Sequence, residues 1–163
     1  MLTSIITWFL SNVFTWTPLL AILIGICRTP PINTNKYANT LRHLFLWYAG
    51  IAFLWSGIFH LLMPAFTAAK IGWANSPFQL EVGLANLSIA VLGFMAFFKK
   101  DSYFWLGVIL ALAVFSVGAG INHAYLFIYA NDHAIDNAGV LMYTDIIAPF
   151  VMLFLWFKSD LDK

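Results

Sequence analysis

The chain has 163 residues, of which 62% are hydrophobic and only 9% are charged, whereas soluble domains carry about 25% charged residues. So few charges cannot cover a surface that faces water, so the composition excludes an ordinary soluble domain. The net charge of +1 excludes the strongly basic surface typical of nucleic-acid-binding proteins. We therefore predict an all-α, polytopic transmembrane bundle that forms one domain over residues 1–163, with the lipid bilayer as its main partner.

Five apolar stretches are long enough to cross a bilayer core, which needs about 20 residues per helix. No Lys, Arg or cleavage site marks the start as a signal peptide, so we expect the first stretch to stay in place. Pro64 is expected to end the second stretch. Ser76, Pro77 and Gln79 predict the start of the third, as N-cap, first helical residue and capping-box partner. The predicted spans are residues 4–27, 44–63, 77–98, 103–130 and 137–157.

The basic residues predict the orientation of these spans, because cytoplasmic loops carry an excess of Lys and Arg. With five spans, seven of the eight basic residues fall on one side, and Lys70 alone falls on the other, with Asp132 and Asp136. We therefore expect the N-terminus outside and the C-terminus inside, in a multi-pass protein of a cell membrane of the bacterial inner-membrane type. The seven residues are Arg28, Lys36, Arg42, Lys99, Lys100, Lys158 and Lys163.

Polar residues inside the spans are functional candidates, because a charge in a membrane is costly unless it is paired or hydrated. At a rise of about 1.5 Å per residue, four ionisable residues on four different helices fall in the outer half of the membrane, each about one to three turns from the outer surface. Two asparagines lie at similar depths. We predict an outward-facing pocket for a small ligand, proton or substrate, lined by His60, Glu81, Asn86, Asn122, His123 and Asp145.

Two other interpretations of the same residues stay open. His60, Glu81, His123 and Asp145 form a two-histidine, two-carboxylate set that would suit a transition metal, although no two of them have a local ligand spacing. Such a site would fit a redox or metal-dependent enzyme acting on a lipid-soluble substrate such as a quinone. Alternatively, the polar network only fixes the helix packing of a structural accessory subunit. The sequence names no catalytic residue.

The third span carries a stripe of small and polar residues on one face, of the kind that membrane helices use for close packing. Glu81 lies on nearly the opposite face, so this helix is either central in the bundle or exposes Glu81 to water. A stripe of this kind also permits self-association into an oligomer. Its members are Gln79, Gly83, Asn86, Ala90 and Gly93.

Several short segments resemble the DoxX-like superfamily of small membrane proteins. They are Gly57-Ile-Phe-His60, Pro64, Ile71-Gly72, Glu81-Val-Gly83 and Leu92-Gly93, and residues 76–87 also resemble a signature of an uncharacterised group of bacterial membrane proteins. The similarity covers about residues 50–157. It implies a four-helix bundle to which the first span is an addition, and for some members an association with quinone, sulfur or other redox metabolism. Of the candidate residues, only His60 and Glu81 fall on matching positions.

Overall fold

The computed structural model describes residues 2–31 and 34–159, and the regular structure within these ranges is helical. Within these ranges, four continuous helices are long and apolar enough to cross a membrane: Lys36–Leu62, Phe78–Phe98, Ser102–Tyr129 and Val140–Lys158. The structure thus confirms the all-α class and the membrane-type helices. In chain order the elements are α1 (Leu2–Ser11), α2 (Val13–Cys27), α3 (Lys36–Leu44), the π-helix η1 (Phe45–Ala52), α4 (Phe53–Leu62), α5 (Pro64–Ile71), α6 (Phe78–Phe98), α7 (Ser102–Tyr129) and α8 (Val140–Lys158).

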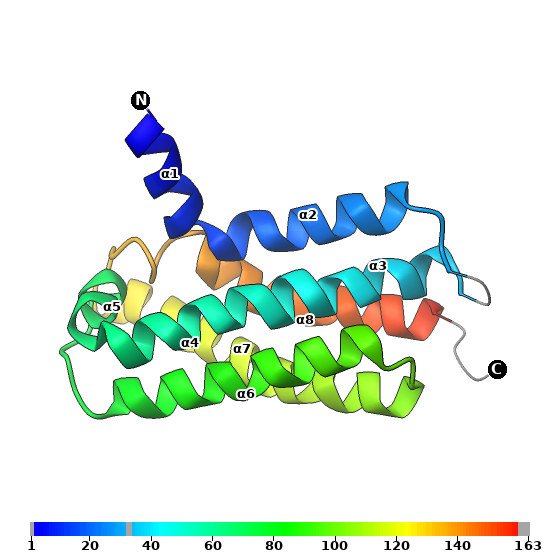
Figure 1. The fold of residues 1–163 in the computed structure, drawn as a ribbon. Helices are drawn as coiled ribbons and strands as arrows, with labels where there is room; N and C mark the ends of the chain where they lie inside the picture. The colour runs from blue at the N-terminus through cyan, green and yellow to red at the C-terminus, as the bar shows by residue number, and fades with distance from the viewer. Residues whose placement is uncertain (1, 32–33, 160–163) are drawn as a thin grey trace.

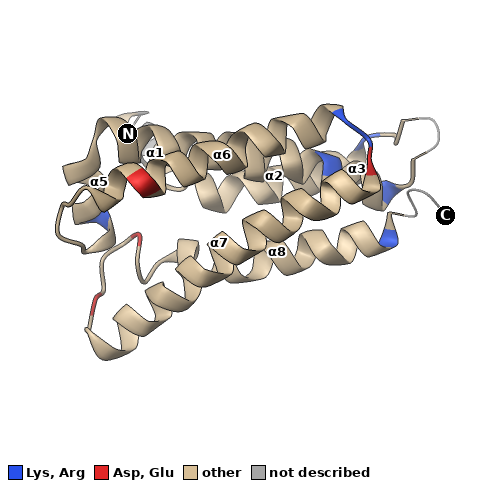
Figure 2. Cartoon of the chain, turned by 90° about the horizontal axis from the view of Figure 1, so that it is seen from below, with Lys and Arg blue, Asp and Glu red and all other residues tan. Residues whose placement is uncertain are grey.

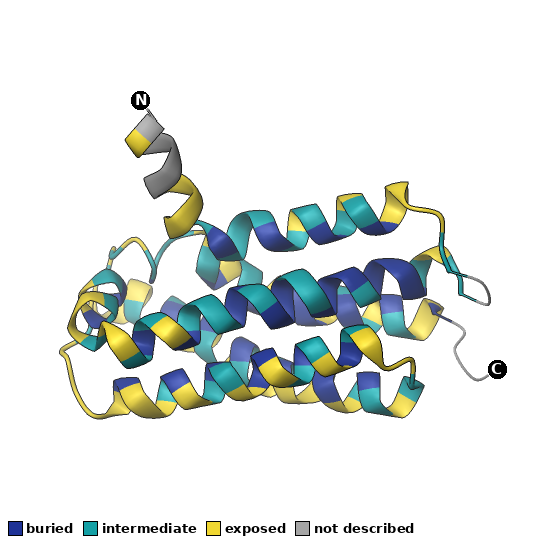
Figure 3. Ribbon diagram, viewed as in Figure 1, coloured by how far each residue is buried: buried dark blue, intermediate teal, exposed yellow. Residues whose placement is uncertain are grey.

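The most deeply buried of these helices is the one formed by α3, η1 and α4 (Figure 3). It begins at Lys36 rather than at residue 44, because the side chain of Asn35 caps it by accepting a hydrogen bond of 2.9 Å from the amide of Ala38. It ends at Leu62, directly before Met63 and Pro64, as Pro64 predicts. In its middle it widens into the eight-residue π-helix η1, a rare conformation that is frequent at functional sites.

The long helices lie side by side along one axis, and the short α5 closes one end (Figure 1). Helix α7 packs against α8, while α6 packs against α4 and η1. Helix α2 covers α3 and η1 from the other side. The predicted third, fourth and fifth spans match α6, α7 and α8 within three residues at each end, because hydropathy and the flanking polar residues mark these helices locally.

The predicted first span is not one straight helix. Asn12 leaves the helical conformation (φ −119°, ψ 32°), and its side-chain amide donates a 2.8 Å hydrogen bond to the carbonyl of Trp8. Helix α1 therefore turns away from the bundle, and only α2 runs along it (Figure 1). With 15 residues, α2 is about 22 Å long. The expectation of one continuous helix over residues 4–27 is wrong, because an asparagine side chain competes for the helix carbonyls at this point.

The small-residue stripe of α6 is buried, as the sequence predicts. A Cβ atom on Gly93 would lie 2.7 Å from the backbone nitrogen of Gly50 and 2.8 Å from the carbonyl carbon of Ala49, both in η1. The two helices thus pack backbone to backbone at this level, which only glycine permits. Glu81, on the opposite face, is exposed, so the alternative in which it reaches the surface is the one observed.

Charged residues gather at the two ends of the bundle, and Asp101 lies among the basic residues of one end (Figure 2). We call the end that carries Arg28, Lys36, Arg42, Lys99, Lys100 and Lys158 the basic end; Lys163 lies outside the described residues. The opposite end, which carries Glu81, Asp132 and Asp136 together with Lys70, is called the acidic end. Between them, α6, α7 and α8 expose large apolar side chains such as Val91, Val114 and Phe150, as expected of a surface in contact with lipid.

At the basic end, side chains donate hydrogen bonds to backbone carbonyl groups at the C-terminal ends of three helices. Asn39 donates to the carbonyl of Gly25 at the end of α2 (2.9 Å), and Asn35 donates to that of Lys158 in α8 (2.9 Å). The ring nitrogen of Trp105 donates to the carbonyls of Ala96 (2.9 Å) and Lys99 (2.7 Å) at the end of α6. These bonds satisfy carbonyl groups that a helix end leaves unpaired, and they hold this end of the bundle together.

A candidate ligand-binding cavity at the acidic end

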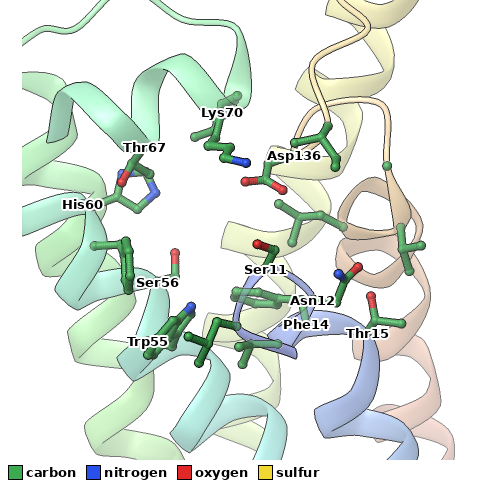
Figure 4. A pocket seen from close by; sticks show the side chains of 18 of the residues that line it. Ser11, Asn12, Phe14, Thr15, Trp55, Ser56, His60, Thr67, Lys70 and Asp136 are labelled. Atoms are coloured by element: carbon green, nitrogen blue, oxygen red, sulfur yellow. The ribbon is translucent and has the colours of Figure 1, made fainter. Parts of the chain in front are cut away.

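A cavity of about 450 Å³ opens at the acidic end. Its walls come from the junction of α1 and α2, from α4 and α5, and from the segment that leads into α8 (Figure 4). Cavities of this size hold small organic ligands. The break at Asn12 helps to form it, because the residues on both sides of the break, Leu10 to Thr15, line one wall.

His60 lines this cavity from α4 (Figure 4), and Gln79 of α6 holds its ring in place. The distance from His60 Nδ1 to Gln79 Oε1 is 2.7 Å, and both residues are buried. Because an amide oxygen only accepts hydrogen bonds, Nδ1 carries the proton and Nε2 is left as an acceptor. The predicted capping box is therefore wrong: Ser76 accepts from the amide of Phe78 (3.3 Å), but the Gln79 side chain is used to orient His60.

Lys70 and Asp136 both line the cavity, and their side chains point toward one another (Figure 4). The backbone amide of Asp136 donates a 3.1 Å hydrogen bond to the carbonyl of Lys70, which ties the segment before α8 to the last turn of α5. Burial raises the pKa of the Asp136 carboxyl, and the nearby Lys70 ammonium opposes this rise. The two side chains approach without forming a close ion pair, so each keeps hydrogen-bonding capacity for a third group.

The remainder of the cavity wall combines aromatic surface with small polar groups. Trp55 and Phe59 of α4 pack against each other with ring centroids 4.6 Å apart, and Phe66 of α5 continues this wall. Ser56 lies on the adjacent face of α4 and accepts a 3.2 Å hydrogen bond from Asn86 of α6. Asn86 therefore supports the cavity wall from behind rather than lining it.

His123 lies outside the cavity and fastens the loop between α7 and α8. Its Nδ1 atom is 2.8 Å from Oδ1 of Asn137, whose amide group donates to the carbonyl of Asp132 at 2.9 Å. Trp73 stacks on the His123 ring, with centroids 6.3 Å apart and planes inclined by 26°. These contacts have the character of a packing network, which is one of the roles the sequence left open for this residue.

The other predicted pocket residues are dispersed. Glu81 and Asn122 are exposed on α6 and α7. Asp145 is buried in α8, one turn below Leu141, which lines the cavity wall. Of the six predicted residues, only His60 lines the cavity, because the depth of a residue along a helix does not determine the face on which it lies.

The four-residue metal set is not formed. Within residues 2–31 and 34–159, no group of three or more His, Cys, Asp or Glu side chains is arranged to hold a metal ion. His60 and His123 are each bound to a different side-chain amide, and Glu81 is exposed. Metal ligation requires donors about 2 Å from one centre, so these four side chains do not constitute a ligand shell in this arrangement.

Sequence reasoning missed Lys70, Asp136 and the aromatic wall as parts of the site. One signal in the sequence pointed to this pair. Lys70 is the single basic residue expected on the outer side, and the acidic residue Asp136 is expected on the same side. Their proximity could not be deduced, because α6 and α7 separate them in the chain. The arrangement now visible combines one cation, one carboxyl group, a histidine acceptor and aromatic surface, which suits a small molecule with a polar head and an apolar body.

No curated protein and no solved structure matches this chain. A family model of a family of unknown function, DUF6790, matches residues 8–163. This match confirms the expected membership of an uncharacterised family, and no comparison supports the resemblance to DoxX-like proteins. Because the match covers nearly the whole length, the chain belongs to the family of unknown function DUF6790.

Proposed function

We propose that this chain is a five-span membrane protein that binds a small amphipathic molecule in the cavity at its acidic end, which faces the non-cytoplasmic side. The observation that carries this proposal is the cavity itself, with Lys70, Asp136 and His60 converging on a space walled by Trp55 and Phe59. The polar groups would hold the head of the ligand, and the aromatic rings would hold its body.

The distribution of charge supports this orientation. Six of the seven Lys and Arg residues that the structure describes lie at one end of the bundle, together with Asp101, and Lys70 lies at the other end with Glu81, Asp132 and Asp136 (Figure 2). Cytoplasmic loops are enriched in Lys and Arg. In this topology α2 is a short first crossing, α1 lies on the outer side, and the membrane is of the bacterial inner-membrane type. A short crossing is accommodated by local thinning of the bilayer.

The opposite charges of Lys70 and Asp136 indicate the kind of head group. A ligand that carries both an anionic and a cationic group would pair with both side chains at once, whereas a singly charged ligand would leave one of them unpaired in a partly buried site. The metal-enzyme interpretation has less support, because its four residues are dispersed. A packing role is supported for His123, which is bonded to Asn137, and for Asn86, which is bonded to Ser56.

The native cysteine offers a direct test of the topology. Cys27 is exposed at the basic end, so a membrane-impermeant maleimide should not label it in intact cells and should label it after permeabilisation. In a Cys27→Ser background, Thr67→Cys in the cavity wall should show the reverse and react in intact cells. Labelling of Cys27 from outside would overturn the orientation.

Three matched aromatic probes test the ligand class in protein reconstituted in nanodiscs. Phenylalanine carries both charges, 3-phenylpropanoate carries the negative one, and 2-phenylethylamine carries the positive one. We expect phenylalanine to bind most tightly in calorimetric titrations. Lys70→Ala should weaken the binding of phenylalanine and of 3-phenylpropanoate, because both carry a negative charge. Asp136→Asn should weaken the binding of phenylalanine and of 2-phenylethylamine, because both carry a positive charge.

The controls replace like residues outside the cavity: Lys100→Ala for Lys70, and Glu81→Gln for Asp136. Both residues are exposed, so neither change should alter binding. Binding that is equal in the cavity variants and the controls would overturn the proposal, and so would the absence of binding by all three probes.

A further inference from the structure

Beneath the cavity, three polar side chains from three helices meet inside the apolar bundle. Asp145 of α8 is buried, and Tyr48 of η1 and Ser116 of α7 have exposed fractions of 0% and 1%. The Ser116 hydroxyl interacts with both the Tyr48 hydroxyl and the Asp145 carboxyl. Neither hydroxyl has a well-formed hydrogen bond to another group of the described chain.

Among the residues that the structure describes, no positive charge compensates Asp145. Within the described residues, Tyr48 is the titratable group that interacts with it. The neighbouring helices direct their polar groups elsewhere: Thr17 of α2 donates to the carbonyl of Val13 (2.6 Å), and His43 of α3 interacts with Arg42 and Arg28 at the basic end. An ionised carboxylate without a partner is very costly in such surroundings, whereas a neutral carboxyl group both donates and accepts hydrogen bonds.

Helices α7 and α8 are brought close together at this level by Gly120. A Cβ atom there would lie 3.3 Å from the Cβ atom of Asp145 and 2.6 Å from a side-chain carbon of Ile146. This contact leaves Asp145 fixed in the interhelical space rather than directed to lipid. Ionisable residues that face a bundle interior are candidates for proton or ion sites, because a charge inside a membrane is costly.

We propose that Asp145, with the hydroxyl groups of Tyr48 and Ser116, forms a proton-binding site in the membrane interior. The carboxyl group holds the proton, and the two hydroxyl groups, which have no other partner within the described chain, are available to form hydrogen bonds with it. This site is separate from the ligand cavity, and the proposal does not rest on what the cavity binds.

Phe14 separates the two sites. It lines the cavity and packs on its inner side against Tyr48, with ring centroids 6.0 Å apart and perpendicular planes. Leu141, one turn above Asp145 on α8, lines the same cavity. The proton therefore exchanges with the outer side through the cavity when the Phe14 ring moves aside, and the site is closed to water otherwise.

Infrared spectroscopy of the protein in nanodiscs tests whether Asp145 holds a proton. At neutral pH, carboxyl groups in water are ionised, so we expect a carbonyl band of a protonated acid that Asp145→Asn removes and Asp136→Asn leaves in place. Ser116→Ala and Tyr48→Phe should each move this band to higher frequency, because the carboxyl group loses a hydrogen bond. A spectrum without this band, or a band that neither hydroxyl variant moves, would overturn the proposal.

Chemical labelling provides the second measurement. The apolar reagent dicyclohexylcarbodiimide attacks protonated carboxyl groups in apolar surroundings, so peptide mapping should find Asp145 modified at neutral pH and Asp132 unmodified. A water-soluble carbodiimide should reach Asp145 in Phe14→Leu and not in the unchanged protein. If sodium chloride, but not potassium chloride, protected Asp145 from modification by dicyclohexylcarbodiimide, the site would bind sodium. This result would overturn the assignment to a proton.

Discussion

His60 and Gln79 form a buried pair between α4 and α6, with Nδ1 of the histidine 2.7 Å from the amide oxygen of the glutamine. The pair fixes which ring nitrogen is free to accept a hydrogen bond from a ligand. It also joins two helices that pack closely along their length. The same contact thus contributes to stability and prepares a binding group.

A double-mutant cycle measures how much the His60–Gln79 pair contributes to the free energy of unfolding. Gln79→Leu should lower the free energy of unfolding by about 1–3 kcal/mol, because it leaves the Nδ1–H group of His60 buried without a partner. His60→Leu should cost a similar amount. The double variant should cost less than the sum of the two, and strictly additive costs in thermal or denaturant unfolding would contradict the pairing.

Gly93 should not tolerate a methyl group. Gly93→Ala places a Cβ atom 2.7 Å from the backbone of Gly50, so α6 and η1 must separate, at a cost of about 1–3 kcal/mol. Gly118 is the matched control, since nothing lies within 4 Å of a Cβ atom there. Gly118→Ala should instead stabilise the helix by about 0.5–1 kcal/mol, and a similar melting temperature for the two variants would refute the close packing.

Asn39 should stabilise the fold at the basic end. Asn39→Ala removes its hydrogen bonds to the carbonyls of Gly25 (2.9 Å) and Arg28 (3.4 Å). We expect a loss of about 1–3 kcal/mol, because these carbonyl groups lose their partner. Asn122 is exposed, so Asn122→Ala should change the unfolding free energy by less than about 0.5 kcal/mol. Equal effects of the two substitutions would show that the Asn39 bonds contribute nothing.

Asp136 should make the stability of the protein depend on pH. Burial raises the pKa of its carboxyl group in the folded protein, so the folded state binds this proton more tightly than the unfolded state does. The resulting stabilisation is complete below the ordinary pKa of 3.8 and is lost as the pH rises through the raised value. Asp136→Asn should therefore flatten the fall of the melting temperature over this window.

Lys70→Ala provides a second test of the same group. It removes the cation that opposes the rise in the pKa of Asp136, so the loss of stability should occur at higher pH than in the unchanged protein. The difference between each protein and its Asp136→Asn counterpart isolates this carboxyl group. Parallel pH profiles of the unchanged protein and Asp136→Asn would contradict the assignment.

The spans could be predicted from the sequence because their signals are local. Hydropathy and flanking charges locate α6, α7 and α8, and the alternation of small residues locates the buried face of α6. The break at Asn12 was missed because a single asparagine within an apolar stretch is compatible with a continuous helix until its side chain bonds to Trp8.

The site was harder to predict, because its contacts join residues that are distant in the sequence. Gln79 has the spacing of a capping-box residue, and only the packing of α4 against α6 directs it to His60. Asp136 belongs to a polar loop that resembles an ordinary turn, and its place in the cavity depends on the bond between its amide and the carbonyl of Lys70. Asp145 was recognised as an intramembrane acid, but its partners Tyr48 and Ser116 became visible only in three dimensions.

The contacts at the two ends of α2 determine which end of this helix can move. At the basic end α2 is attached by Asn39, and a Cβ atom on Gly25 would collide with the backbone of Thr40. At the other end of α2, Asn12 and its neighbours form one wall of the cavity. Any rocking of α2 therefore pivots near Gly25 and has its greatest amplitude at Asn12, so a motion of one helix widens or narrows the cavity mouth while the basic end keeps its shape.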